Sequence, residues 1–179
     1  YSLLFQLGLF FANGNQYSDL LSTLECLTSI VVKYEEKEGV NPDKRISSFA
    51  MVLIQKQITM IGDYDEESSD VLDNIVENVV YLTTGNPMPS LQVVINSFVD
   101  GISRIQCYWC VKLLGAFLNR YQDFEIYNDF FNELSKVTLT ILSSEFMNKY
   151  AIESTAIAYE ICVIFKLLPI NDVASSVFD

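Results

Sequence analysis

The chain of 179 residues is 50% hydrophobic and carries 23 acidic against 11 basic residues, for a formal net charge of −12. A surface of this sign repels phosphate backbones, so we expect no direct nucleic-acid partner. We also expect no membrane partner, because no apolar run reaches the ~18 residues that cross a bilayer.

Apolar residues recur at helical spacing and predict eight helices that follow one another in pairs. The predicted helices span residues 3–12, 17–34, 44–61, 70–82, 91–100, 103–121, 124–142 and 143–168. Turn-forming residues separate them, most clearly over 85–89, after which Ser90 is expected to cap the fifth helix. Pro169 ends the eighth helix, and residues 170–179 are expected to form a frayed tail.

The pairs begin roughly every 40 residues, close to the period of HEAT and armadillo arrays. Over its whole length the chain therefore resembles an armadillo- or HEAT-type helical repeat protein. The resemblance implies a right-handed α-solenoid segment of about four helical pairs, whose second helices line a concave binding face. The Trp–Asn array of peptide-binding armadillo proteins is absent, since the residue four after Trp109 is Leu113. We expect residues 1–179 to form a single all-α domain that is part of a longer chain.

A second resemblance covers Phe98-Val99-Asp100-Gly101-Ile102-Ser103-Arg104-Ile105 and the apolar residues 107–118. This stretch is similar to the BH1 region of Bcl-2-like proteins, in which an Asp-Gly pair and an Arg precede a buried central helix. Ser103 replaces the Asn-Trp-Gly that stands before the arginine in that family. The resemblance implies an alternative fold, a compact Bcl-2-like helical bundle, which would bind an amphipathic helix in a groove beside the predicted sixth helix.

The four cysteines, Cys26, Cys107, Cys110 and Cys162, all lie within predicted apolar helices. We expect them to be reduced and buried, as in an intracellular protein of the cytoplasm or nucleus. Cys107 and Cys110 have the C-x-x-C spacing of thiol–disulfide enzymes, but no strand is predicted before them. Without a histidine or a second such pair, they also lack the four ligands that zinc requires. The pattern predicts core packing, with no metal and no cofactor.

Acidic residues alternate between Asp63 and Glu67 in a way that partly matches a calcium-binding loop. Ser68 stands at the position of the required glycine, and Asn74 at that of the required glutamate. The segment is therefore expected to be a solvated acidic loop.

Two predicted helices carry polar side chains at helical spacing that could bind a partner. The partner-binding candidates are Asp70, Asp73, Glu77 and Tyr81 on the fourth helix, and Arg104, Tyr108, Lys112 and Asn119 on the sixth. The acidic group could hold Lys or Arg side chains of a partner, or it could be the plain solvent-facing side of an amphipathic helix. If both helices line one surface, the partner is expected to be a basic or mixed-charge peptide or helix.

These features predict a non-enzymatic protein–protein interaction scaffold rather than an enzyme. Histidine, the usual general base near neutral pH, is absent, and the carboxylates lie in predicted loops or on exposed helix faces. Ser135 and Lys136 are adjacent on a helix and therefore point apart. The predicted first helix is apolar nearly all round, which suggests self-association through the terminal helices or a covering partner. Its apolar residues are Leu3, Leu4, Leu7, Leu9, Phe10 and Phe11.

Overall fold

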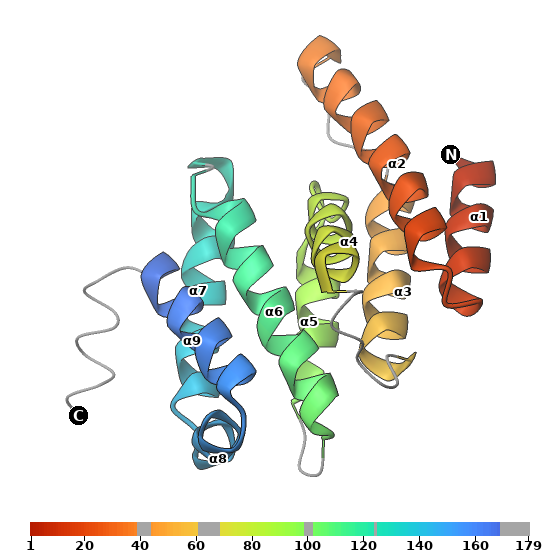
Figure 1. Cartoon of the computed structure of the whole chain (residues 1–179). Coiled ribbons are helices and arrows are strands. Elements are labelled where there is room, and N and C mark those ends of the chain that lie inside the picture. Colours follow the sequence, from red (N-terminus) through yellow and green to blue (C-terminus); the bar gives the residue numbers. More distant parts are fainter. Residues whose placement is uncertain (39–43, 61–68, 99–101, 124, 169–179) are drawn as a thin grey trace. The chain divides into compact units, whose positions relative to one another are not determined.

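The computed structural model describes residues 1–38, 44–60, 69–98, 102–123 and 125–168, and every regular element within these ranges is helical (Figure 1). The predicted all-α class is therefore confirmed for the described residues. The elements are α1 Ser2–Asn13, α2 Tyr17–Glu38, α3 Lys44–Met60, α4 Ser69–Tyr81, α5 Met88–Asn96, α6 Arg104–Tyr121, the short 3-10 helix η2 Glu125–Tyr127, α7 Asn128–Leu142, α8 Glu145–Glu153 and α9 Thr155–Leu167.

The chain divides into two compact units, Tyr1–Val93 and Val94–Asp179, with the boundary inside α5. We refer to them as unit 1 and unit 2 and describe each by itself. The single domain expected from the sequence stays a prediction. The expected tail over 170–179 and the calcium-like segment around Asp63 to Glu67 lie outside the described residues.

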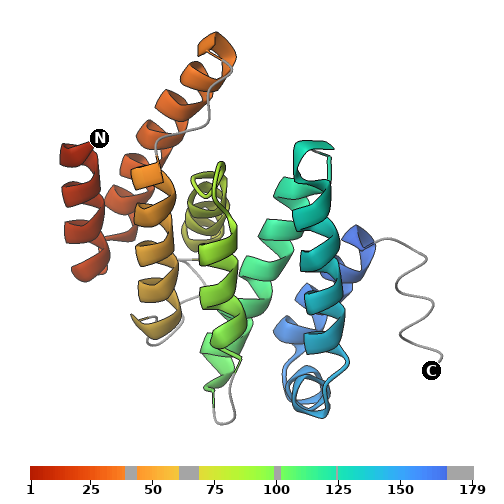
Figure 2. The ribbon, with the colours of Figure 1, turned by 180° about the vertical axis from the view of Figure 1, so that it is seen from behind.

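In unit 1, helices α1 to α4 form a closed ring of neighbours. Helix α2 packs against α1 and α4, and α3 in turn packs against the same two helices. In Figure 1 α2 crosses in front of α3, whereas in Figure 2, seen from behind, α3 lies in front of α2. The turn between α1 and α2 places Asn15 at a φ of 53°, a left-handed conformation that asparagine tolerates.

The core of unit 1 is built from apolar stripes at helical spacing. The buried stripes consist of Leu20, Leu24, Leu27 and Val31 on α2, Phe49, Ala50, Leu53 and Ile54 on α3, and Leu72, Ile75, Val76, Val79 and Val80 on α4. Valine-rich sequence is often typical of strands, but the three- and four-residue spacing in α4 favours a helix. The prediction of α4 as a helix with one apolar side is confirmed.

A hydroxyl in α3 ties this helix to the turn that follows α4. The Ser47 Oγ donates hydrogen bonds to the carbonyl oxygens of Thr83 and Thr84, at 3.5 and 3.3 Å, and all three residues are buried. Gly85 then adopts a φ of 97°, a conformation that glycine reaches without steric penalty. The Gly-Asn-Pro break that the sequence predicts thus begins with a buried, hydrogen-bonded turn.

In unit 2, α6 is the helix on which the others pack. It contacts α7 and α9, and α8 bridges between those two helices. Nine residues of α6 are buried: Cys107, Trp109, Cys110, Val111, Leu113, Leu114, Phe117, Leu118 and Tyr121. The N-terminus of α6 carries a capping box, in which the Ser103 hydroxyl accepts from the Gln106 N–H and the Gln106 side chain accepts from the Ser103 N–H.

The structure corrects several predicted helix boundaries: α5 ends at Asn96 rather than at residue 100, and α7 begins at Asn128, after η2, rather than at residue 124. The single eighth helix over 143–168 is two helices, because Ser154 has an extended backbone (φ −143°, ψ 113°) and its hydroxyl caps α9 by accepting from the Ile157 N–H. Ser90 is a buried residue inside α5 rather than its cap, since α5 begins at Met88 and tolerates Pro89 in its first turn.

Candidate functional site

The polar side of α4 places all four of its predicted partner-binding residues in one stripe. Asp70, Asp73, Glu77 and Tyr81 follow one another at spacings of three, four and four residues, which brings them to one face of a helix. Asp70 and Glu77 are exposed, while Asp73 and Tyr81 are half-buried. The buried valines and isoleucine lie on the opposite side of α4. We call these four residues the α4 acidic stripe.

The two asparagine side chains of α4 that lie beside this stripe donate hydrogen bonds to the helix backbone. The Asn74 side-chain amide donates to the Asp70 carbonyl oxygen at 2.8 Å, and that of Asn78 donates to the Asn74 carbonyl oxygen at 2.9 Å. Both are bonds to the helix backbone four residues earlier. No basic residue occurs within α4, so the charge of this helix is wholly negative.

The second predicted group, on α6, is divided by the structure. Arg104 and Asn119 are exposed. Lys112 is largely buried, and its Nζ lies 3.6 Å from Glu160 Oε1 of α9, with only 13% and 16% of the two side chains exposed. The same Nζ lies 5.6 Å from the centre of the Tyr108 ring. Lys112 therefore takes part in the packing of α6 on α9 within unit 2, and the Tyr108 ring of its own helix lies beside its ammonium group.

Glu160 is a residue that sequence reasoning did not select. It is the single acidic residue of α9, a mostly apolar helix, and a charged side chain that is largely buried is usually paired. The pairing with Lys112 joins residues 48 positions apart, so periodicity within one helix could not have shown it. The α4 and α6 groups belong to different units, and their union into one binding surface stays a prediction.

The C-x-x-C pair lies in the core of unit 2. Cys107 and Cys110 are fully buried, and the Cys107 Sγ lies 3.9 Å from the Met147 Sδ of α8. Burial raises the pKa of Cys107 to about 11; burial, and then the neighbouring Cys107, raise that of Cys110 to about 12. Because the thiolate is the nucleophile, these cysteines are poor candidates for thiol chemistry.

The remaining two cysteines correct the expectation that all four are buried. Cys26 and Cys162 are exposed. Cys26 lies two residues from Leu24 and so faces away from the buried stripe of α2. Cys162 likewise lies two residues before the buried Ile164 of α9. Both positions have apolar neighbours in sequence, which is why composition alone suggested burial.

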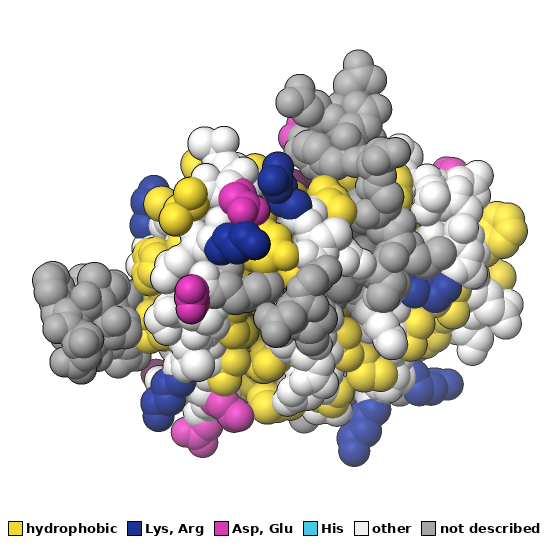
Figure 3. Space-filling model, turned by 90° about the horizontal axis from the view of Figure 1, so that it is seen from below, with side chains coloured by type: hydrophobic (Ala, Val, Ile, Leu, Met, Phe, Trp, Pro, Cys, Tyr) yellow, Lys and Arg dark blue, Asp and Glu magenta, His cyan; other side chains and the backbone are white. Residues whose placement is uncertain are grey.

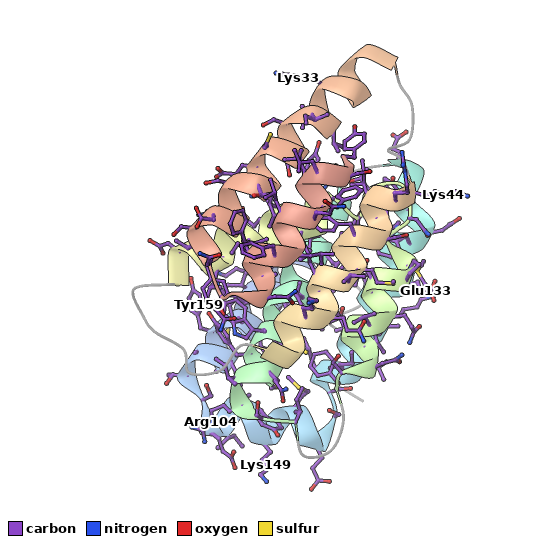
Figure 4. The ribbon with its side chains drawn as sticks, turned by 90° about the vertical axis from the view of Figure 1, so that its right-hand side faces the viewer. Lys33, Lys44, Arg104, Glu133, Lys149 and Tyr159 are labelled. Carbon is purple, nitrogen blue, oxygen red and sulfur yellow. The ribbon has the colours of Figure 1, made fainter. Side chains whose placement is uncertain are left out.

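A further surface feature is apolar. Leu3, Leu7 and Phe10 of α1 are exposed, and in unit 2 Ile152 of α8 and Tyr159 of α9 are exposed as well. Figure 3 shows hydrophobic side chains at the surface, including the right-hand edge, on the side where α1 lies in Figure 1. In Figure 4 the labelled cations Lys33, Lys44, Arg104 and Lys149 lie toward the outer edge of the molecule.

Among the described residues there is no group of three or more His, Cys, Asp or Glu side chains suited to hold a metal ion. Within the same part of the chain, no helix combines the length and apolar character needed to cross a bilayer.

Comparison of the chain with models of protein families finds no matching family, and comparison with curated proteins and with solved structures finds no significant match. Neither the armadillo/HEAT nor the Bcl-2-like resemblance is therefore supported by a relative.

Proposed function

We propose that this chain is a non-enzymatic protein-interaction module in which the α4 acidic stripe binds a basic or mixed-charge helix or peptide. The observation that carries the proposal is the division of α4 into two sides. Its apolar side is buried in unit 1, while Asp70 and Glu77 on the other side are exposed. These two carboxylates are seven residues apart, a rise of about 10 Å along the helix axis. That distance matches two cations placed seven residues apart on a partner helix.

The charge of the whole chain supports the same class of partner. A net charge of −12 attracts cationic segments over distances of about a Debye length and raises their rate of encounter. The stripe then adds selectivity, because like charges placed against its carboxylates would repel. A cationic partner is therefore favoured over an anionic one, including nucleic acid.

The packing of unit 1 supports a helical repeat as the frame for this site. A ring in which α1, α2, α4 and α3 contact one another in turn is the arrangement that two stacked helical hairpins produce. We propose that the chain continues this pattern as a right-handed solenoid segment, with α4 as the second helix of its pair. The Bcl-2-like alternative depends in part on residues 99–101, which lie outside the described residues, and no observation favours it separately.

We assign the main contact to α4 rather than to α6. The Lys112 ammonium already has Glu160 and the Tyr108 ring as neighbours, so drawing it to a partner would break an internal ion pair. Arg104 and Asn119 remain exposed and could extend a contact on unit 2. The raised thiol pKa values of the buried C-x-x-C pair support an interaction role over redox chemistry, and we propose an intracellular location, in the cytoplasm or nucleus.

A peptide titration tests this function. The probe is an amphipathic helical peptide of about 16 residues with lysines at positions i, i+3 and i+7 of one face, and its binding is followed by fluorescence anisotropy. The double variant Asp70→Asn/Glu77→Gln is expected to weaken binding roughly 3- to 10-fold, since each exposed ion pair contributes up to ~1 kcal/mol. The wild-type affinity is expected to fall as salt is added.

The matched control removes two exposed carboxylates from α2 of the same unit. The variant Asp19→Asn/Glu25→Gln changes the net charge by the same amount and is expected to alter the affinity less than about twofold. Equal losses in both variants would mean that the peptide follows the overall charge of the chain, and the α4 assignment would then be rejected. A glutamate-substituted version of the peptide that bound equally well would reject the electrostatic mechanism.

A further inference from the structure

Three buried sulfur-containing side chains lie together in the core of unit 2, and they come from two different helices. Cys107 and Cys110 of α6 and Met147 of α8 are each 0% exposed. The Cys107 thiol donates a weak hydrogen bond to the Met147 thioether, with 3.9 Å between Sγ and Sδ. Cys110 follows Cys107 by three residues on the buried side of α6, a spacing at which helical side chains are neighbours. We call these three residues the sulfur cluster.

Two hydrogen bonds hold α8 in the position that brings Met147 against Cys107. The Ser144 hydroxyl caps α8 by accepting from the Met147 N–H at 3.2 Å, which fixes the backbone of this residue. Three residues later, the Tyr150 hydroxyl donates to the Ile102 carbonyl oxygen, in the segment that leads into α6. Helix α8 is thereby tied to the N-terminal end of α6, where the two cysteines lie. The third sulfur is held by defined polar contacts as well as by apolar packing.

We propose that the sulfur cluster binds one Cu(I) ion, through the two cysteine thiolates and the Met147 thioether. Thiolate and thioether sulfurs are the soft ligands that Cu(I) prefers. A metal ion in the plane of three sulfurs, with metal–sulfur bonds of about 2.3 Å, holds those sulfurs about 4 Å apart. The 3.9 Å between Cys107 Sγ and Met147 Sδ matches this separation. One sulfur pair at such a distance is an ordinary packing contact, whereas the neighbouring buried thiol of Cys110 completes a set of three ligands.

The ligand set favours Cu(I) over the other common metal ions. Structural zinc takes four ligands and iron–sulfur clusters take four cysteines, whereas the described residues contain no group of even three His, Cys, Asp or Glu side chains. Calcium and magnesium require oxygen ligands, which none of the three side chains supplies. The C-x-x-C spacing shows only two of the three sulfurs. The third lies 40 positions after Cys107 and is brought there by the packing of α8.

Binding at this site is an exchange of protons for metal, without electron transfer. At each cysteine the S–H bond breaks, a copper–sulfur bond forms and the proton passes to the buffer, while the thioether has no proton to lose. Copper enters and stays as Cu(I), so no oxidant or reductant is consumed. Because the sulfur cluster is fully buried, entry requires local opening of unit 2, and loading is expected to be slower than at an exposed thiol. The same burial shields the bound ion from water and from competing ligands.

Competition for Cu(I) tests the site in a parent protein, the full chain with Cys26→Ser/Cys162→Ser, which lacks the two exposed thiols. Cu(I) is kept reduced with ascorbate under nitrogen, and the chelator bathocuproine disulfonate reports the copper it removes by absorbance. The parent is expected to retain about one Cu(I) per chain and to unfold at a higher temperature when loaded. Adding Cys107→Ala/Cys110→Ala is expected to abolish both effects. Adding Met147→Leu, which nearly conserves volume and so favours folding, is expected to weaken binding at least about tenfold.

The matched control is Met51→Leu in α3 of unit 1, which is expected to leave the affinity of the parent for Cu(I) unchanged. X-ray absorption of the loaded parent is expected to show three sulfur neighbours at about 2.3 Å from copper, and two after Met147→Leu. Loss of all copper from the parent to the chelator would overturn the site. So would equal retention in Cys107→Ala/Cys110→Ala, or nitrogen and oxygen neighbours in place of sulfur. Equal affinities of the Met147→Leu and Met51→Leu variants would reject the three-sulfur arrangement.

Discussion

Helices α1 and α4 both belong to unit 1, yet they present opposite chemistry to solvent. Helix α4 buries Ile75, Val76, Val79 and Val80. It exposes Asp70 and Glu77. Helix α1 has no charged residue and exposes two leucines and a phenylalanine. The difference teaches that burial of one apolar side does not make a helix amphipathic. An ordinary amphipathic surface helix exposes its polar side, whereas α1 exposes apolar side chains and no charge.

The largest effect that would sharpen this comparison comes from truncating one branched aliphatic side chain in each helix. Ile75 of α4 is completely buried, so Ile75→Ala is expected to lower the free energy of unfolding by about 2–4 kcal/mol. Leu3 of α1 is 67% exposed, so Leu3→Ala is expected to change it by less than about 0.5 kcal/mol in the monomer. Urea unfolding at low protein concentration measures both. Similar losses in the two variants would mean that Leu3 is covered and that the two helices do not differ as described.

The cysteines offer the same contrast between inward and outward positions. Exposed Cys26 and Cys162 are expected to react with iodoacetamide in the native protein at pH 8, while Cys107 and Cys110 react at least about 100-fold more slowly. Mass spectrometry of tryptic fragments identifies the labelled positions. Rapid native labelling of Cys107 or Cys110 would contradict the buried assignment and reopen a redox role.

Those raised thiol pKa values also set the direction of a pH effect. The folded pKa lies above the ordinary value of 9.0, at about 11 for Cys107 and about 12 for Cys110. The folded state therefore favours the neutral thiols, and this adds fully to the free energy of unfolding below pH 9. The added stability is lost as pH rises from 9 toward 12, because the unfolded thiols then ionise. Replacing both by Ala is expected to flatten that alkaline loss of stability.

The smallest effect concerns the two mid-helix glycines. Gly8→Ala places a methyl group 2.7 Å from the Phe49 Cζ, and the expected loss is about 1–2 kcal/mol because the stacked ring must shift. At Gly115 of α6 the nearest atom would be Ile164 Cγ1 at 3.5 Å, an ordinary contact. Gly115→Ala is therefore expected to gain about 0.5–1 kcal/mol from helix propensity. Thermal unfolding compares the two, and a gain at Gly8 would show that α1 is seated less closely on α3.

The sequence predicts a helix accurately where the periodic pattern of apolar and polar residues lies within that one helix. The bounds expected for the fourth helix, 70–82, differ from Ser69–Tyr81 by only one residue at each end. The agreement is close because apolar and polar residues recur at helical spacing throughout this segment. The prediction fails at Ser154, where apolar residues continue on both sides of a serine cap and hide the break between α8 and α9. A helix cap depends on the backbone conformation and on a side-chain hydrogen bond, and neither changes the apolar periodicity of the sequence.

The candidate site shows the same contrast between patterns within one helix and contacts between helices. The four members of the α4 acidic stripe are neighbours on one helix, so spacing alone could place them together. The spacing of polar residues within α6 predicts that Lys112 lies on an exposed, partner-binding face. Its contact with Glu160 depends on how α6 packs against α9, and no pattern within either helix contains that information.

The sequence by itself determined that the chain is helical, where most helices lie, which side of α4 is apolar, and that the chain carries a large negative charge, because these depend on neighbouring residues and on composition. Only the tertiary structure decided which side of α1 is buried, since that helix is apolar nearly all round and Phe49 selects the side that carries Gly8. It also decided that Lys112 is paired and that Cys26 and Cys162 are exposed. The physical reason is the same in each case: burial is a property of the neighbouring helix, and the neighbour is distant in sequence.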